Sequence, residues 1–201
     1  MSATRLLVLG VVRMHGKAHG YQVRRDLLSW GADKWANVAP GSIYHALKQM
    51  TKEGLLEHVD SEPDARPERT GYRLTEDGET EFQILLGKSL AEVDVNQAGQ
   101  YDLAAAITFM TALPRKKAIS LLRHRLTQLA GQQANARGLL EESAGWGQPE
   151  HIAELHRFWL SCLDATVAWT ESLIKRLERG QYVMADDGPK HFGGLVVIKL
   201  D

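Results

Sequence analysis

The fold is decided by residues 40–56, whose sequence is PGSIYHALKQMTKEGLL. Proline suits the first position of a helix, and Gly54 can end that helix by adopting a positive φ. At about 100° per residue, one face carries four apolar side chains: Ile43, Ala46, Leu47 and Met50. The opposite face is polar, with Ser42, Tyr44, His45, Lys48, Gln49 and Lys52. Such a helix fits a DNA major groove, although an ordinary solvated helix has the same pattern.

Two helices are predicted before this stretch. Thr4 suits the N-cap of a helix that runs to Met14 and carries Leu6, Leu7, Leu9, Val11 and Val12. A second helix is predicted over residues 20–30, and Gly31 ends it. Three helices separated by glycines are typical of a helix-turn-helix unit.

A hairpin is predicted directly after Gly54. Residues 56–61 alternate in polarity as a strand does, and residues 69–74 form a returning strand. Pro63 and Pro67 exclude the polar loop between them from the strand ladder. A helix-turn-helix followed by a hairpin is a winged helix, so residues 1–86 are predicted to form a winged helix-turn-helix domain.

The rest of the chain is predicted to be helical, which makes the protein mainly α. A linker is expected over 87–100, an all-α dimerisation and effector domain over 101–180, and a tail over 181–201. Apolar residues recur every three or four positions from Ile119 to Leu140, including Leu126, and again from Ile152 to Leu177. Because two narrow seams bury little surface alone, we expect a second copy to cover them; the alternative is a bundle within one chain.

The composition is that of a globular protein, with 44% hydrophobic and 24% charged residues among 201. No apolar run approaches the roughly 20 residues of a membrane helix, and the apolar start lacks the basic region of a secretory signal. Cys162 is the single cysteine, so no intramolecular disulfide is expected. These features predict a cytoplasmic protein that is not bound to a membrane.

The net charge of −1 gives no general attraction to nucleic acid. Up to His58 the chain has eight lysines and arginines against four acids, whereas residues 59–81 have three against eight. Any DNA-binding surface must therefore be local.

Four short motifs together resemble the PadR family of bacterial transcription regulators. They are His19-Gly20-Tyr21, the run Ser42 to Leu47, Gly54-Leu55-Leu56, and the run Tyr72 to Gly78. The resemblance covers residues 4–82, and the C-terminal half is similar only in architecture. It implies a homodimeric winged helix that binds an imperfect palindrome in double-stranded DNA, represses transcription and is often released by a small molecule. Position 45, commonly proline in the family, is His45 here.

The predicted DNA contacts are Gly20, Tyr21, Ser42, Tyr44, His45, Lys48, Gln49, Lys52, Arg66 and Arg69. Lys48 can donate to guanine or to phosphate, and Gln49 can pair with adenine. The Gly20 amide and the Tyr21 hydroxyl suit a phosphate, although Tyr21 can equally belong to the core. Arg66 and Arg69 lie in the wing, where Arg69 can alternatively pair with Glu57 or Glu68.

The last long helix is predicted to make the dimer. The expected dimerisation residues are Ile152, Leu155, Trp159, Leu163, Val167, Ile174 and Leu177. An aromatic effector is predicted to bind among His156, Phe158, Trp159 and Trp169, although aromatic residues at helical spacing are more often core.

The sequence does not favour an enzyme. Residues 10–17 echo a phosphate-binding loop, but the spacing is one residue too long and Ala18 stands where serine or threonine is needed. His15 and His19 are four apart across Gly16, so no metal site and no cofactor are expected. The remaining alternative is a winged helix that binds protein instead of DNA.

Overall fold

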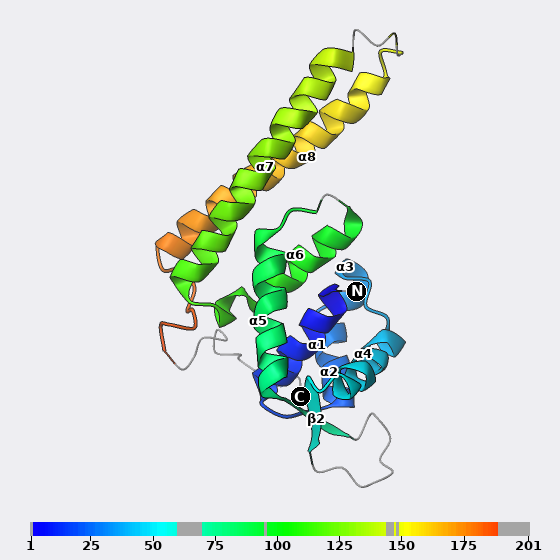
Figure 1. Cartoon of the computed structure of the whole chain (residues 1–201), viewed down its shortest axis with the longest axis vertical. Coiled ribbons are helices and arrows are strands. Elements are labelled where there is room, and N and C mark those ends of the chain that lie inside the picture. The colour runs from blue at the N-terminus through cyan, green and yellow to red at the C-terminus, as the bar shows by residue number, and fades with distance from the viewer. Residues whose placement is uncertain (1, 60–69, 95, 144–146, 148, 189–201) are drawn as a thin grey trace. The chain divides into compact units, whose positions relative to one another are not determined.

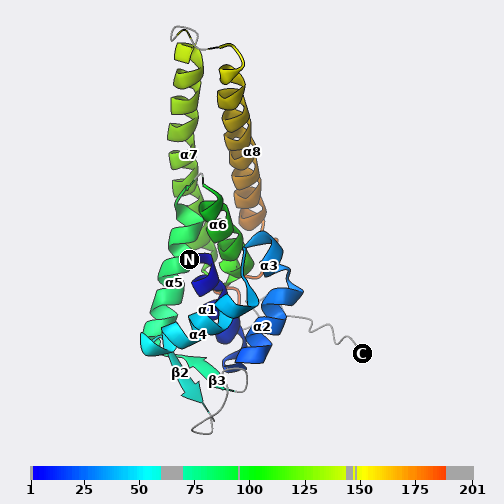
Figure 2. The same cartoon turned by 90° about the vertical axis from the view of Figure 1, so that its right-hand side faces the viewer.

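The computed structural model describes residues 2–59, 70–94, 96–143, 147 and 149–188 (Figures 1 and 2). These residues are mainly helical with one small sheet, which confirms the predicted fold class. The chain divides into two compact units, residues 1–90 with 94–112 and residues 91–93 with 113–201. Arg66, Arg69 and the predicted strand near Val196 lie outside the described residues.

The first unit is built around helix α1 (Ser2–His15). Leu6 to Leu9, Val11 and Val12 are all fully buried, so α1 is covered on nearly every side. Helices α2 (Gly20–Ser29), α4 (Pro40–Lys52) and α6 (Gln97–Phe109) contact it, and Figure 2 shows them grouped about it. A Cβ at Gly10 would lie 2.4 Å from the Phe109 ring, so α6 packs closely on α1 because position 10 is glycine.

The wing is a three-stranded antiparallel sheet with strand order β1-β3-β2. β2 (Leu56–Val59) pairs with β3 (Gly71–Leu74) in the register Leu56 to Leu74, and β1 (Ala18–His19) pairs with the other edge of β3. The predicted hairpin is therefore present, and residues 60, 61 and 69 of its predicted strands lie outside the described residues. β1 was not predicted, because two residues show no alternation.

The turn between α2 and α4 contains helix α3 (Ala32–Trp35), which was not predicted. Gly31 begins α3 with a φ of 72°, and Asn37 after it has a φ of 53°. Val38 donates its N–H to the Ala32 carbonyl, 3.2 Å away, and its side chain is buried. The turn is thus a compact element that fixes where α4 begins.

The boundary between the units differs from the predicted linker. Helix α5 (Glu76–Ala91) continues through the first five residues of the expected linker, and α6 begins at Gln97 with the Asn96 side chain as its N-cap. Because Ala105, Ala106 and Phe109 are buried with α1, α6 belongs to the first unit. Gly99, one of the small residues that suggested a linker, instead lies in α6, where a Cβ would meet the Asp94 carbonyl oxygen at 2.3 Å.

The second unit is a hairpin of two long helices, α7 (Arg115–Ser143) and α8 (Ile152–Glu178), after a short 3-10 turn η1 (Met110–Ala112) that ends the first unit. α7 and α8 lie side by side in both views (Figures 1 and 2). The buried seam of α7 contains Ala118, Leu122, Arg125 and Leu129, whereas Ile119 and Leu126 are only half-buried. Leu122 and Leu129 of the predicted seam are therefore buried as expected, whereas Ala118 and Arg125 take the places expected for Ile119 and Leu126.

Arg125 is the unexpected member of this seam. Its side chain is 4% exposed, one guanidinium nitrogen donates to the Glu92 carbonyl, and burial lowers its pKa. Gln128 accepts from the Val93 backbone N–H at 3.0 Å. Together these bonds attach residues 92 and 93 to α7, which explains why that short segment belongs to the second unit.

The first part of the tail closes the base of the hairpin. Arg115 donates to the Leu177 carbonyl at 2.8 Å and to the Tyr182 carbonyl at 2.7 Å, and it also contacts Asp187. The Met184 backbone N–H and the Arg115 guanidinium lower the pKa of the Asp187 carboxyl. Residues 182–187 are thus a structural clasp. Within the described ranges, no helix is long and apolar enough to cross a membrane.

Asp102 on α6 gives a prediction for stability. Burial raises the pKa of its carboxyl, although the Ala3 backbone N–H at the start of α1 donates to it. A raised folded-state pKa contributes stability at low pH that is lost as the pH rises through that pKa. Asp102→Asn keeps an acceptor and removes the charge. The urea midpoint of the variant minus that of wild type should therefore be larger at pH 7 than at pH 3. An equal difference at both pH values would contradict this.

Candidate nucleic-acid interface

The exposed side of α4 carries one row of residues: Gly41, His45, Lys48 and Lys52. Their spacing of four, three and four places them on a single helical line. The opposite side of the helix is buried, with Ile43, Leu47 and Met50 fully inaccessible and Ala46 nearly so. Lys48 and Lys52 make no ion pair with any residue in the described ranges, so both ammonium groups are available to a ligand.

Other predicted residues of α4 lie at the edge of this row. The Ser42 hydroxyl donates to the Ala39 carbonyl at 2.7 Å, so it is already used in the first turn. The Gln49 amide donates to Glu53 at 3.0 Å, and this bond and then Arg5 lower the pKa of the Glu53 carboxyl. Tyr44 is half-buried. Among the predicted residues of α4, His45, Lys48 and Lys52 are therefore the best placed for a direct contact.

Two predicted DNA contacts, Gly20 and Tyr21, lie at the start of α2. The structure corrects the prediction for Gly20 and shows that Tyr21 is exposed. Gly20 is buried and its N–H donates to the Thr70 carbonyl at 3.3 Å, so it is not free for a phosphate. The reason is that β1 leads directly into α2 and pairs with β3. Tyr21 is 50% exposed and stacks on His19, with ring centroids 5.8 Å apart. It is a surface residue and not part of the core.

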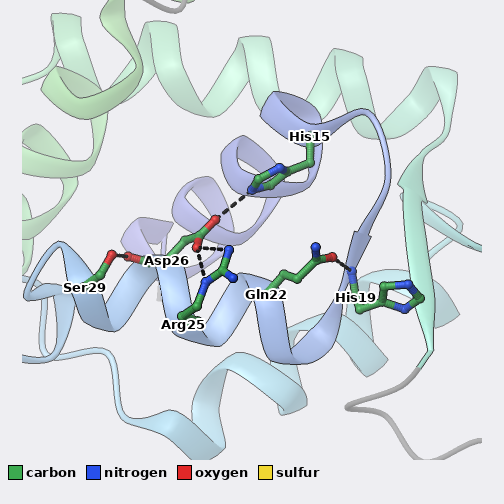
Figure 3. Close-up of polar contacts among 6 residues, drawn as sticks. All are labelled: His15, His19, Gln22, Arg25, Asp26 and Ser29. Atoms are coloured by element: carbon green, nitrogen blue, oxygen red, sulfur yellow. Dashed lines mark hydrogen bonds and ion pairs between the residues drawn. The ribbon is translucent and has the colours of Figure 1, made fainter. Parts of the chain in front are cut away.

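A polar cluster around Asp26 holds α2 to the end of α1 (Figure 3). The Asp26 carboxylate contacts His15 Nε2 at 2.7 Å and accepts from Arg25 Nε at 2.9 Å. Its side chain is only 14% exposed, whereas that of Arg25 is 63% exposed. At the other end of α2, the Gln22 side chain accepts from the His19 backbone N–H at 2.7 Å. These bonds fix α2, which in turn supports α4.

The described part of the wing carries a polar surface that the sequence did not single out. Arg73 pairs with Glu57 at 2.8 Å across the hairpin, and the His58 ring packs edge-on against Tyr72. Glu57 is thus paired with Arg73. The opposite charges face each other in the β2–β3 register, a signal that pairing the two strands in the sequence would have revealed.

The predicted dimerisation residues fall into two groups in α8. Ile174 and Leu177 are buried at the base of the hairpin within one chain, so they are not available to a second copy. This corrects their prediction, because α7 covers that part of the seam. Leu155 and Trp159 are 45% and 48% exposed, and Ile152, Leu163 and Val167 are half-buried.

The predicted effector residues do not enclose one space within a single chain. Phe158 is 63% exposed, and His156 meets Trp159 edge-on with ring centroids 5.7 Å apart. Trp169 lies ten residues beyond Trp159, which is roughly 15 Å along the helix. An aromatic effector site therefore stays a prediction that would need a second chain.

The residues that suggested other chemistry have structural explanations. Gly10 is inside α1 against Phe109, so residues 10–17 do not form a phosphate-binding loop. Among the described residues, no group of three or more histidine, cysteine or acidic side chains is placed to hold a metal ion.

Residues 8–84 match the family model described as the transcriptional regulator PadR-like family. This segment, 77 of the 201 residues, is similar to that family. The match confirms the resemblance found in the motifs, and it ends within α5. The PadR-like segment thus contains α2, α4 and the wing, whereas α7 and α8 lie outside it.

Solved structures with weak overall similarity include Bacillus subtilis PadR in complex with operator DNA, at 20% identity and a TM-score of 0.37 over 86% of this chain and 98% of that one. The same protein in complex with p-coumaric acid has 18% identity and a TM-score of 0.37 over 87% and 97%. A PadR-like regulator from Bacillus cereus has 18% identity and a TM-score of 0.36 over 88% and 99%. These scores are too low to support an argument. No curated protein matches the sequence.

The Asp26 cluster gives a prediction for the PadR-like unit. Asp26→Ala should lower the free energy of unfolding by about 1–3 kcal/mol, because it removes charge-assisted bonds to His15 and Arg25. Arg25→Ala is the matched control and should cost less than about 1 kcal/mol, since the Arg25 side chain is exposed. Urea denaturation measures both. Equal losses would show that Asp26 does not connect α1 to α2.

Proposed function

We propose that this protein is a sequence-specific DNA-binding transcription regulator. The observation that carries the proposal is the exposed row of His45, Lys48 and Lys52 on α4, within a segment that is similar to the PadR-like family. The apolar side of α4 is fully buried, so the row is presented by a rigid helix and not by a loop. A helix presented in this way fits the major groove of a duplex.

In this account each cation acts at short range. Lys48 lies in the middle of the row and donates to guanine or to an adjacent phosphate. Lys52 lies one turn further and meets the backbone. His45 contributes a donor or an acceptor near the bases. Tyr21 on α2 supplies a hydroxyl at the edge of the surface. Because the net charge is −1, affinity depends on these contacts and not on a general cationic field.

A homodimer would provide the second recognition helix. The distal half of the hairpin exposes Leu139 on α7 and Leu155, Phe158 and Trp159 on α8. The Gln133 amide donates to Asp164, so antiparallel pairing sets Leu139 at about the height of Phe158. These four side chains therefore gather at one end of the hairpin. Exposed apolar side chains gathered in this way mark an association surface.

The partner that suits this surface is a second copy of the chain. Two hairpins would form a four-helix bundle, in which apolar seams from each copy are covered by the other. The resulting dimer would hold two α4 helices for half-sites about one DNA turn apart, roughly 34–36 Å. Such an operator is an imperfect palindrome, and occupying it beside a promoter represses transcription. An aromatic effector between the two α8 helices would act by favouring another spacing.

The alternative function is a winged helix that binds protein. The low surplus of positive charge favours this alternative, and the acids beside the row, such as Glu53, would suit a basic partner. The two functions differ in their response to salt, because only the release of counterions from DNA gives a steep linear dependence of log K on log salt.

Lys48→Ala tests the DNA-binding surface. The affinity for a duplex selected from a random-sequence pool should fall, and the slope of log K against log salt should flatten by about one if Lys48 meets a phosphate. Fluorescence anisotropy at several salt concentrations measures both quantities.

The matched control for Lys48 is Lys175→Ala, which removes an exposed lysine of α8 and should leave the affinity unchanged. If Lys48→Ala binds the duplex as wild type does while its fold is intact, the row on α4 is not the DNA-binding surface. If wild type selects no duplex from the pool, the protein-binding alternative replaces the proposal.

Phe158→Glu tests the dimer. A carboxylate in the exposed apolar group should convert dimers into monomers in sedimentation velocity, because burying an unpaired charge is costly. The fold should be retained, since Phe158 is 63% exposed within one chain. Ala168→Glu is the control and should leave the dimer intact, because Ala168 is also exposed but lies about 80° around α8 from Phe158 and nearly three turns further along it. A dimer that survives Phe158→Glu would place the interface elsewhere.

A further inference from the structure

Gly41 is a helical residue for which the fold gives no reason to be glycine. It is the second residue of α4, is exposed, and begins the row that continues through His45, Lys48 and Lys52. Leaving aside its two chain neighbours and the backbone of its own helix, a Cβ built at position 41 meets no heavy atom of the described residues within 4 Å. Its φ is not positive, so other residue types can adopt its conformation.

Other glycines of the same unit are required by the structure. A Cβ would meet a heavy atom at 2.5 Å or less at Gly10, Gly71, Gly78 and Gly99. A positive φ accounts for Gly16, Gly31 and Gly54. Neither reason applies to Gly41. Moreover, glycine is less favourable than alanine in a helix, so this choice weakens the helix that presents the row.

We propose that Gly41 is a DNA-contact residue, glycine because a bound duplex occupies the space of its missing side chain. The inference rests on the proposed function, and it adds a residue that carries no hydrogen-bonding side chain. The row shows why contact is expected there: the surface along which Lys48 and Lys52 would follow the groove passes over position 41. A methyl group at that point would hold α4 away from the DNA and lengthen the contacts made by the residues behind it.

The account predicts changes of opposite sign for folding and for binding. Gly41→Ala should leave the urea midpoint unchanged or raise it, because alanine favours the helix. The same variant should bind the selected duplex about tenfold more weakly or worse, as a lost base-pair contact does. A purely structural role for Gly41 would instead lower the urea midpoint.

Gly131→Ala is the matched control. Gly131 is also exposed and helical, lies in α7, and has no heavy atom of the described residues within 4 Å of a built Cβ. Its replacement should likewise raise or preserve the urea midpoint, and the affinity for the duplex should not change. The pair separates an effect of helix propensity from an effect of the space at position 41.

The experiment measures the affinity of the full chain, wild type and both variants, for the selected duplex by fluorescence anisotropy, with urea denaturation of each. Weaker binding by Gly41→Ala alone, with a stable fold, supports the inference. Equal binding by all three proteins overturns it and leaves the proposed function standing. Failure of wild type to bind any duplex overturns both, and a lower urea midpoint for Gly41→Ala overturns the inference in favour of a structural role.

Discussion

Burial of α1 is the constraint on which the first unit depends. Its apolar residues are inaccessible almost all around the helix, and helices α2, α4 and α6 are placed by contact with it. Two close contacts in this unit require glycine. Gly10 allows the Phe109 ring of α6 to pack against α1, and Gly78 allows the start of α5 to approach the Leu55 carbonyl. Because α4 uses its whole apolar face in this packing, its polar face is fixed outward. The candidate interface is therefore a consequence of how the core is filled.

The second unit is governed by a different constraint, which is that two helices alone bury little surface. The base of the hairpin is well buried and is closed by the clasp around Arg115. Towards the other end, the seam contains Gln133 and Asp164, and large apolar side chains stay exposed. A buried Arg125 within the seam adds a charge that the helices must accommodate. These features limit what one hairpin can stabilise, and a partner that covers the distal half would remove that limit.

The sequence predicted the parts of the fold that repeat or that end at a glycine. The helices, the hairpin and the faces of α4 follow from periodicity and from turn residues, so their prediction succeeded. β1 and α3 were missed because two and four residues are too short to show a period. The division near α6 was misplaced because alanine and glycine indicate close packing as readily as a linker. For the site, the exposed cations of α4 were predictable, and the Arg73–Glu57 pair follows from the register of the hairpin. The engagement of the Gly20 amide and the Asp26 cluster depends on contacts between elements that the sequence does not align.

The central claim is that α4 enters the major groove as part of a pair. It is tested most directly by dimethyl sulfate protection of a selected duplex, because this reagent methylates guanine N7, which faces the major groove. The account predicts two patches of protected guanines whose centres lie about 10 base pairs apart, one for each α4. Binding that leaves guanine N7 unprotected would contradict it, since the protein would then hold the duplex without its recognition helix in the groove.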